Sequence, residues 1–159
     1  MTKSSAGLVL FRLRAGRPEF LLVHPGGPFW ARKDAGAWFV PKGEVEAGED
    51  RLAAACREFE EETGCTPRGP FLELGSVRNK SGKTITAWAF EGDCDPQAIA
   101  SNLFTIEWPP RSGKQQQFPE VDRAAFFALE EARVKASSAE LALLERLAEV
   151  LAARGGPPQ

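Results

Sequence analysis

Short apolar runs punctuated by polar turn residues dominate the first quarter of the chain. Two such runs cover residues 6–13 and 19–23, and the turn-prone segment Ala15-Gly16-Arg17-Pro18 separates them. Runs of this length, rich in Leu, Val and Phe, are typical of β-strands, and the intervening residues favour a tight turn. We therefore expect a β-hairpin at the start of the chain.

Four further apolar segments have strand length. They cover residues 71–78, 84–90, 103–108 and 124–127, and the polar stretch 79–83 forms a hinge between the first two. Strands interrupted by two helical segments, one in the middle of the chain and one at its end, predict a mixed α/β fold.

The last helix is expected to begin at a cap formed by Ser137 or Ser138 and to end at Ala153. Its apolar positions recur at helical spacing: Leu141, Leu144, Leu147 or Ala148, and Leu151. Packing on the core is the expected role, and a homodimer seam is the alternative, because about two heptads are too few for a coiled coil. Residues 1–154 are expected to form one domain, and residues 155–159 a mobile tail.

The central helical segment has two chemically different faces. Because each residue turns the helix by about 100°, spacing assigns side chains to faces. One face collects Arg57, Glu58, Glu61 and Glu62. The other collects Leu52, Cys56, Phe59 and Thr63. We expect the second face to pack on a core and the acidic face to point outward.

The acidic face is electrostatically unfavourable as a plain surface. Glu58 lies one turn from Glu62 and three residues from Glu61, and only Arg57 offers local relief. The carboxylates also gather before Gly64, where the helix dipole penalises anions. A solvated surface is the simple alternative, but a hard divalent ion such as Mg²⁺ or Mn²⁺ would offset both penalties. Such ions commonly complete their coordination with phosphate oxygens, which predicts a phosphate-containing substrate.

The segment from residue 43 to residue 65 resembles the signature box of the Nudix hydrolases. Seven positions carry the resemblance: Gly43, Glu49, Arg57, Glu58, Glu61, Glu62 and Gly64. A chance match is expected on the order of once in a million such chains. Residues 38–42 resemble the strand that leads into the box, and only Cys65 departs from the usual aliphatic residue. The resemblance implies the Nudix fold, a mixed β-sheet sandwiched between helices.

The resemblance also implies a metal-dependent activity. Members hydrolyse a nucleoside diphosphate linked to a further group, by water attack on a phosphorus of the pyrophosphate linkage. Here Glu58, Glu61 and Glu62 would hold the metal ions, and the backbone carbonyl of Lys42 can join them. The ions would neutralise phosphate charge and activate water.

Other box residues are assigned supporting or catalytic roles. Arg57 is expected to position Glu61 through their one-turn spacing. Glu61, and after it Glu58, are the candidates in the box for the general base. Lys42 and the loop that begins at Gly43 are expected to shape the phosphate entrance.

Glu120 is a further catalytic candidate outside the box. It lies in the segment Phe118-Pro119-Glu120-Val121-Asp122, which resembles the acidic loop where many relatives carry an extra carboxylate. The alternative is an ordinary solvated glutamate.

Two basic and aromatic segments are candidates for substrate binding. Arg32 and Lys33 lie between Trp30 and Trp38, so they form either a phosphate clamp beside a base-stacking wall or, equally, solvated cations beside a core tryptophan. Trp108, Arg111 and Lys114, with Lys83, form the second candidate, for the distal phosphates. The single histidine, His24, is expected to pack at a strand end rather than to act as a base.

The substrate expected from the resemblance is a dinucleoside polyphosphate of the diadenosine tetraphosphate type. These enzymes commonly have a tyrosine after the box, whereas this chain has none, so an aromatic residue such as Trp88, Phe104, Trp108 or Phe118 would stack the adenine. An ADP-ribose substrate is less favoured. A MutT-like nucleoside triphosphate pyrophosphohydrolase and a non-catalytic nucleotide sensor remain alternatives.

Composition narrows the partners. A chain of 159 residues suits one domain, and its net charge of −2 gives no general attraction to long nucleic acid or to a membrane. Its three cysteines have neither disulfide-framework nor zinc-site spacing. The first residues lack a signal-peptide pattern, and a cytoplasmic location is expected.

Overall fold

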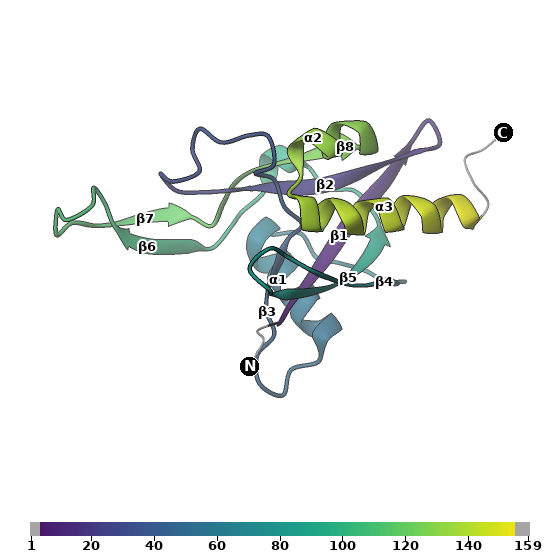
Figure 1. Ribbon diagram of the computed structural model, residues 1–159, viewed down its shortest axis with the longest axis horizontal. Helices are drawn as coiled ribbons and strands as arrows, with labels where there is room; N and C mark the ends of the chain where they lie inside the picture. The colour runs from purple at the N-terminus through teal and green to yellow at the C-terminus, as the bar shows by residue number, and fades with distance from the viewer. Residues whose placement is uncertain (1–3, 155–159) are drawn as a thin grey trace.

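A computed structural model describes residues 4–154 and is built on a mixed β-sheet (Figure 1). The main sheet has the order β4-β5-β1-β2-β8, and the short strand β3 pairs with β1. Its strands are β1 (Ser4–Arg14), β2 (Arg17–Pro25), β3 (Lys42–Glu44), β4 (Leu72–Arg78), β5 (Thr84–Glu91) and β8 (Val121–Ala128). The pair β1 and β5 is parallel, whereas the other pairs in this sheet are antiparallel.

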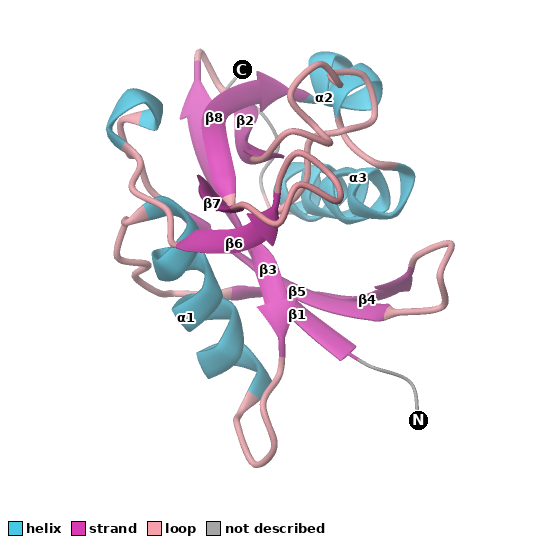
Figure 2. Ribbon diagram, turned by 90° about the vertical axis from the view of Figure 1, so that its left-hand side faces the viewer, coloured by secondary structure: helices cyan, strands magenta, loops and turns pink. Residues whose placement is uncertain are grey.

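Helices cover both faces of this sheet. Helix α1 (Arg51–Thr63) lies on one face, and α2 (Leu129–Lys135) and α3 (Ser138–Ala153) lie on the other, as Figure 2 shows. Strand β1 serves both layers: Leu8 and Leu10 pack in the cluster with α1, and Val9 and Phe11 pack in the cluster with α3. The expected α/β sandwich of the Nudix fold is therefore confirmed.

The predicted N-terminal hairpin is present. Strands β1 and β2 pair antiparallel up to Arg14 and Arg17. Both turn residues have left-handed backbone, with φ of 53° at Ala15 and 80° at Gly16. This geometry suits a two-residue hairpin turn because its twist matches that of the flanking strands.

Helix α1 has defined ends. The Asp50 side chain accepts a hydrogen bond from the Ala53 backbone N–H at 3.1 Å, and Gly64 ends the helix at a φ of 77°. Its buried apolar face includes Phe59 and Thr63, as expected. The prediction of a wholly outward acidic face is wrong for Glu62, which is 5% exposed.

Three elements differ from the sequence-based expectation. Residues 103–108 form the first strand of a separate hairpin, β6 (Leu103–Glu107) with β7 (Gln115–Pro119), which extends away from the main sheet in Figure 1. Helix α2 follows β8 directly and was not expected. The strand expected over 38–42 is reduced to single bridges at Trp38 and Phe39, and β3 begins at Lys42. A short 3₁₀ turn spans Pro96–Ala98.

The predicted last helix matches α3, which follows Ser137 and ends at Ala153. Leu144 and Leu147 are fully buried, and Leu141, Ala148 and Leu151 pack against the same cluster. Core packing therefore accounts for the apolar stripe. The tail expected at 155–159 lies outside the described residues. In residues 4–154, no helix has the length and apolar composition that crossing a membrane requires.

Candidate functional site

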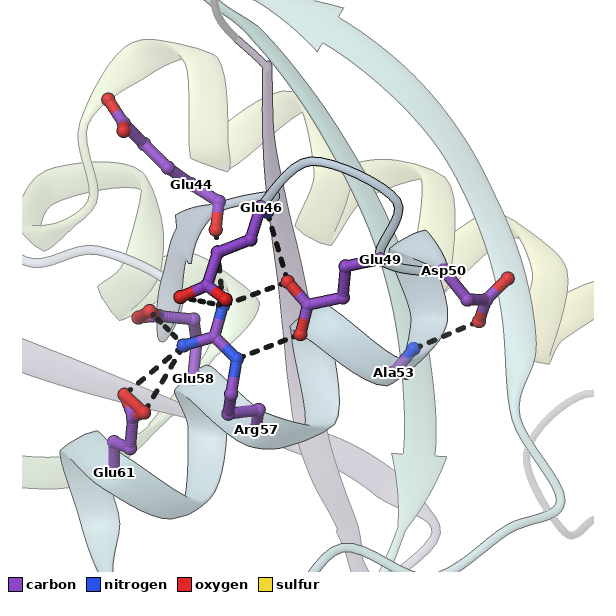
Figure 3. Close-up of polar contacts among 8 residues, drawn as sticks. All are labelled: Glu44, Glu46, Glu49, Asp50, Ala53, Arg57, Glu58 and Glu61. Carbon is purple, nitrogen blue, oxygen red and sulfur yellow. Dashed lines mark hydrogen bonds and ion pairs between the residues drawn. The ribbon is translucent and has the colours of Figure 1, made fainter.

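Arg57 is the centre of the polar network on the outer face of α1 (Figure 3). Its Nε donates to Glu49 Oε2 at 2.8 Å, and its Nη1 donates to Glu58 Oε1 at 3.0 Å and Glu61 Oε1 at 3.2 Å. Its Nη2 also donates to the Glu44 carbonyl at 3.3 Å. The hydrogen bond to Glu49 contributes most to raising the pKa of the Arg57 guanidinium. The expected pairing with Glu61 is thus part of a larger clamp that ties the loop to the helix.

Glu58 points back toward strand β3. A Cβ placed on Gly43 would lie 2.0 Å from Glu58 Cδ, so the carboxylate rests against the bare backbone of that glycine. Burial raises the pKa of Glu58, while the hydrogen bond from Arg57 opposes the shift. The glycine at the start of the box therefore makes room for a carboxylate.

Glu62 is held beneath the same strand. The Lys42 backbone N–H donates to Glu62 Oε1 at 3.2 Å. Burial, and next the neighbouring charge of Glu58, raise the pKa of Glu62 to about 8. Two carboxylates thus lie against β3. Glu58 is paired with Arg57, and Glu62 accepts the Lys42 backbone N–H.

Backbone hydrogen bonds through Asn102 connect Glu120 to helix α1. The Asn102 backbone N–H donates to the Glu61 carbonyl at 3.1 Å, and the Glu120 N–H donates to the Asn102 carbonyl at 2.8 Å. Burial, and next repulsion from Glu61, raise the pKa of Glu120. The loop before β8 therefore brings this carboxylate to the acidic side of α1.

The donor set fits a hard divalent cation. Burial is the main cause that raises the pKa of Glu58, Glu62 and Glu120, and repulsion between neighbouring carboxylates raises the pKa of each one further. Over residues 4–154, no three or more His, Cys, Asp or Glu side chains have the geometry of a formed metal site. Arg57 lies between Glu58 and Glu61, so binding of an ion to both would require these side chains to rearrange.

A cleft of about 660 Å³ is lined by Lys42, whereas none of Arg57, Glu58, Glu61, Glu62 and Glu120 is among its lining residues. It lies among the β4–β5 turn, the end of α2 and the start of α3, and its polar lining includes Lys42, Asn79, Lys80, Arg133 and Glu140. Lys83, the candidate from the sequence, is not among its lining residues, whereas Lys80 and Arg133 are. Arg133 lies on the unexpected helix α2, and Glu140 lies in the first turn of α3, three residues after Ser137.

The Lys42 side chain turns away from the box carboxylates. Its Nζ lies 2.5 Å from Glu140 Oε1 and 4.5 Å from the centre of the Phe39 ring. Glu140 is 3% exposed. The backbone and the side chain of Lys42 therefore contact carboxylates on two different helices.

The segment around Arg32 and Lys33 agrees in part with the interpretation of solvated cations beside a core tryptophan. Trp38 is a core residue at 5% exposure, and Arg32 and Lys33 are exposed. Trp30 is 41% exposed, with Lys33 Nζ 4.9 Å from its ring centre. The exposed Trp30 ring and the adjacent Lys33 ammonium therefore remain candidates to contact a base or a phosphate.

Trp108, Arg111 and Lys114 lie at the turn of the β6–β7 hairpin. The Glu107 carboxylate accepts hydrogen bonds from the Arg111 and Gly113 backbone N–H groups at 3.3 and 3.0 Å. The Trp108 ring packs edge-on against Phe29, with centres 5.3 Å apart. The hairpin turn and the Phe29–Trp30 segment therefore form one exposed aromatic and basic surface.

His24 has a structural place, as expected. It is fully buried on β2, where its Nδ1 lies 2.8 Å from Asp122 Oδ1 and its Nε2 lies 2.6 Å from the Lys33 carbonyl. Both ring nitrogens are therefore used in fixing the loop after β2.

A model of the NUDIX domain family matches residues 1–147. The chain therefore belongs to this family, whose hydrolases generally use a divalent metal ion such as Mg²⁺.

Particular relatives refine this placement. The chain is 42% identical over 66 residues to the asymmetrical bis(5'-nucleosyl)-tetraphosphatase of Caenorhabditis elegans, a match that covers 42% of this chain and 44% of that protein. A crystal structure of a C. elegans Ap4A hydrolase binary complex superposes with a TM-score of 0.66 at 26% identity, covering 94% of this chain and 98% of that one.

The fold alone is shared more widely. The NUDIX domain of Shewanella oneidensis NrtR, complexed with ADP ribose, superposes with the same TM-score of 0.66 at 19% identity, covering 95% of this chain and 89% of that one.

Proposed function

We propose that this protein is a Mg²⁺-dependent hydrolase of nucleoside diphosphates linked to a further group, with dinucleoside polyphosphates such as diadenosine tetraphosphate as its substrates. The observation that carries the proposal is the packing of Glu58 and Glu62 against β3, the strand that begins at Lys42. Similarity to an asymmetrical tetraphosphatase and to an Ap4A hydrolase structure supports this substrate class.

Glu58 and Glu62, with Glu61 and the Lys42 carbonyl, are the residues that would hold the metal. Mg²⁺ or Mn²⁺ bound there would neutralise phosphate charge and lower the pKa of a water molecule. Glu62 must lose a proton before it can act as a ligand, because its pKa is raised to about 8.

The remaining roles belong to the protein's own side chains. Arg57 holds Glu58 and Glu61 in place against the loop before α1. Glu120 is our choice for the general base because burial and Glu61 raise its pKa toward the range in which a base operates at neutral pH. Glu120 would accept a proton from the attacking water as its oxygen bonds to phosphorus, and the bond from that phosphorus to the bridging oxygen would break, so that this oxygen leaves with the other phosphate group.

Cations along the cleft suit a polyphosphate chain. Lys42, Lys80 and Arg133 line it, and guanidinium and ammonium groups bind phosphate oxygens through charge-assisted hydrogen bonds. The exposed Trp30 and the half-buried Trp108 are candidates to stack a nucleoside base.

A substrate panel tests the proposal. Purified protein with Mg²⁺ is incubated with diadenosine tetraphosphate, ADP-ribose, and normal and oxidised nucleoside triphosphates, and products are separated by chromatography beside a Glu61→Gln variant. We expect fastest turnover of the tetraphosphate and loss of turnover in the variant. Preference for a triphosphate would establish the MutT-like alternative, and binding without turnover would establish a sensor.

A further inference from the structure

Lys42 connects the box helix to α3 through two separate contacts. Its backbone N–H holds Glu62, and its ammonium lies 2.5 Å from Glu140 Oε1. Glu140 is in the first turn of α3, on the opposite layer of the sandwich from α1. A single residue of β3 therefore reaches both helical layers.

The Glu140 carboxylate is almost completely buried, unlike the carboxylates of ordinary surface ion pairs. Its side chain is 4% exposed, against 20% for that of Lys42. Its second oxygen, Oε2, accepts a hydrogen bond from the Ser137 hydroxyl. A buried carboxylate is costly unless it is paired and hydrogen-bonded, so both contacts are needed to keep Glu140 in place.

The exposed part of Lys42 borders the cleft, because Lys42 and Glu140 both line it beside Lys80. An ammonium group has three donors. The contact with Glu140 is an ion pair, because Glu140 Oε1 has no hydrogen-bond partner among the described residues. The Phe39 ring, 4.5 Å from Nζ, limits the positions of the ammonium further. Lys42 is thus held at the cleft wall with donors left for another anion.

We propose that Glu140 is a positioning residue that fixes the Lys42 ammonium at the cleft wall for contact with substrate phosphate. This inference rests on the proposed function, and it adds a residue of α3 to the machinery that the box supplies. The fixed ammonium gives up little side-chain freedom on binding, so the loss of Glu140 weakens phosphate binding.

The first test measures the ion pair without any turnover. Surface lysines are acetylated with a limiting amount of acetic anhydride, and the rates at Lys42 and Lys80 are compared by mass spectrometry. We expect Lys42 to react several times faster in Glu140→Gln than in the natural protein, with Lys80 unchanged. Glu149→Gln, an exposed site on the same helix, is the matched control. An unchanged Lys42 rate in Glu140→Gln would overturn the proposal.

The second test measures phosphate binding. Calorimetry with inorganic tripolyphosphate and Mg²⁺ compares the natural protein with Glu140→Gln, Lys42→Gln and the double variant. We expect each single change to weaken binding about tenfold, and the double variant to be no weaker than Lys42→Gln. Additive losses, or no tripolyphosphate binding by the natural protein, would overturn the proposal.

Two further points keep these tests decisive. Should Glu140→Gln not fold, Ser137→Ala removes only the second contact of Glu140, and we expect the same effects at smaller size; their absence would overturn the proposal. A substrate panel without turnover would reject the proposed function alone. The role of Glu140 would still be tested, because acetylation of Lys42 and binding of tripolyphosphate are measured without turnover.

Discussion

The Glu58 carboxylate fills the space that a side chain at Gly43 would need. A Cβ on Gly43 would stand 2.0 Å from Glu58 Cδ, and the two residues lie on separate elements, β3 and α1. Real Cβ atoms do not approach so closely, so the carboxylate can rest here only because residue 43 has no side chain. The position of the Glu58 carboxylate therefore depends on glycine at residue 43.

Replacing Gly43 with alanine should displace Glu58 and lower kcat/KM about 100-fold, because small misplacements of catalytic groups have effects of this size. Gly48→Ala in the same loop is the control. A Cβ there meets nothing within 4 Å, and the strain comes from a φ of 78°. That control should lose about 1–2 kcal/mol of stability and keep its turnover. Equal activity of the two variants would contradict the assigned role of Gly43.

Arg57→Lys should lower kcat/KM about 10- to 100-fold, because an ammonium cannot reproduce the forked contacts with Glu49, Glu58 and Glu61. Arg51→Lys, at the exposed start of the same helix, should behave as the natural protein does. Steady-state kinetics checks both. Indistinguishable rates for the two variants would remove Arg57 from the mechanism.

The stability of the metal-free protein should depend on Glu62. Its pKa is about 8 in the folded protein and near the ordinary 4.5 in the unfolded chain. Between these values the folded state retains a proton that the unfolded chain releases, so stability is full below about pH 4.5 and falls as the pH rises to about 8. Thermal unfolding in EDTA should show this fall, and Glu62→Gln should reduce it. An identical pH slope in the variant would contradict this account.

Glu120→Gln should lower kcat about 100- to 10,000-fold, because the variant lacks the group assigned as general base. The Mg²⁺ concentration for half-maximal activity should change little, since Glu120 is assigned the proton and not the metal. Glu73→Gln, an exposed glutamate on β4, is the control. A kcat of Glu120→Gln equal to that of Glu73→Gln would transfer the role of base to Glu61 or Glu58.

His24→Leu should destabilise the fold by about 1–3 kcal/mol, because it leaves the Asp122 carboxylate and the Lys33 carbonyl without a buried partner. Urea unfolding measures this loss. A variant as stable as the natural protein would show that these hydrogen bonds do not secure the loop after β2.

The elements that sequence patterns predicted well are those with dense local signals. The hairpin β1–β2 has apolar runs around a turn, and α1 has a capping Asp50 and a terminal Gly64. Strand β7 was missed because Gln115, Gln116 and Gln117 have no apolar alternation. Helix α2 was missed because it is short and follows strand β8 directly, with alanine rather than Ser, Thr, Asp or Asn at its N-cap position, Ala128.

In the site, too, contacts within one helix could be predicted from the sequence, whereas contacts between distant segments could not. Spacing alone placed Arg57 beside Glu61, since both lie on one helix. Local spacing accounts for the contact of Glu140 with Ser137, but no local pattern predicts its ion pair with Lys42, 98 residues earlier in the chain. The inward turn of Glu62 likewise follows from the β3 backbone, because the Lys42 N–H receives its carboxylate.

The most direct test of the central claim is the reaction of diadenosine tetraphosphate with the natural protein and Mg²⁺ in ¹⁸O-labelled water, analysed by mass spectrometry. We predict ATP and AMP in equal amounts, one ¹⁸O atom incorporated per cleavage, and no products when EDTA replaces Mg²⁺. Intact substrate after incubation with folded, Mg²⁺-supplied protein would contradict the assignment of this site as a dinucleoside polyphosphate hydrolase.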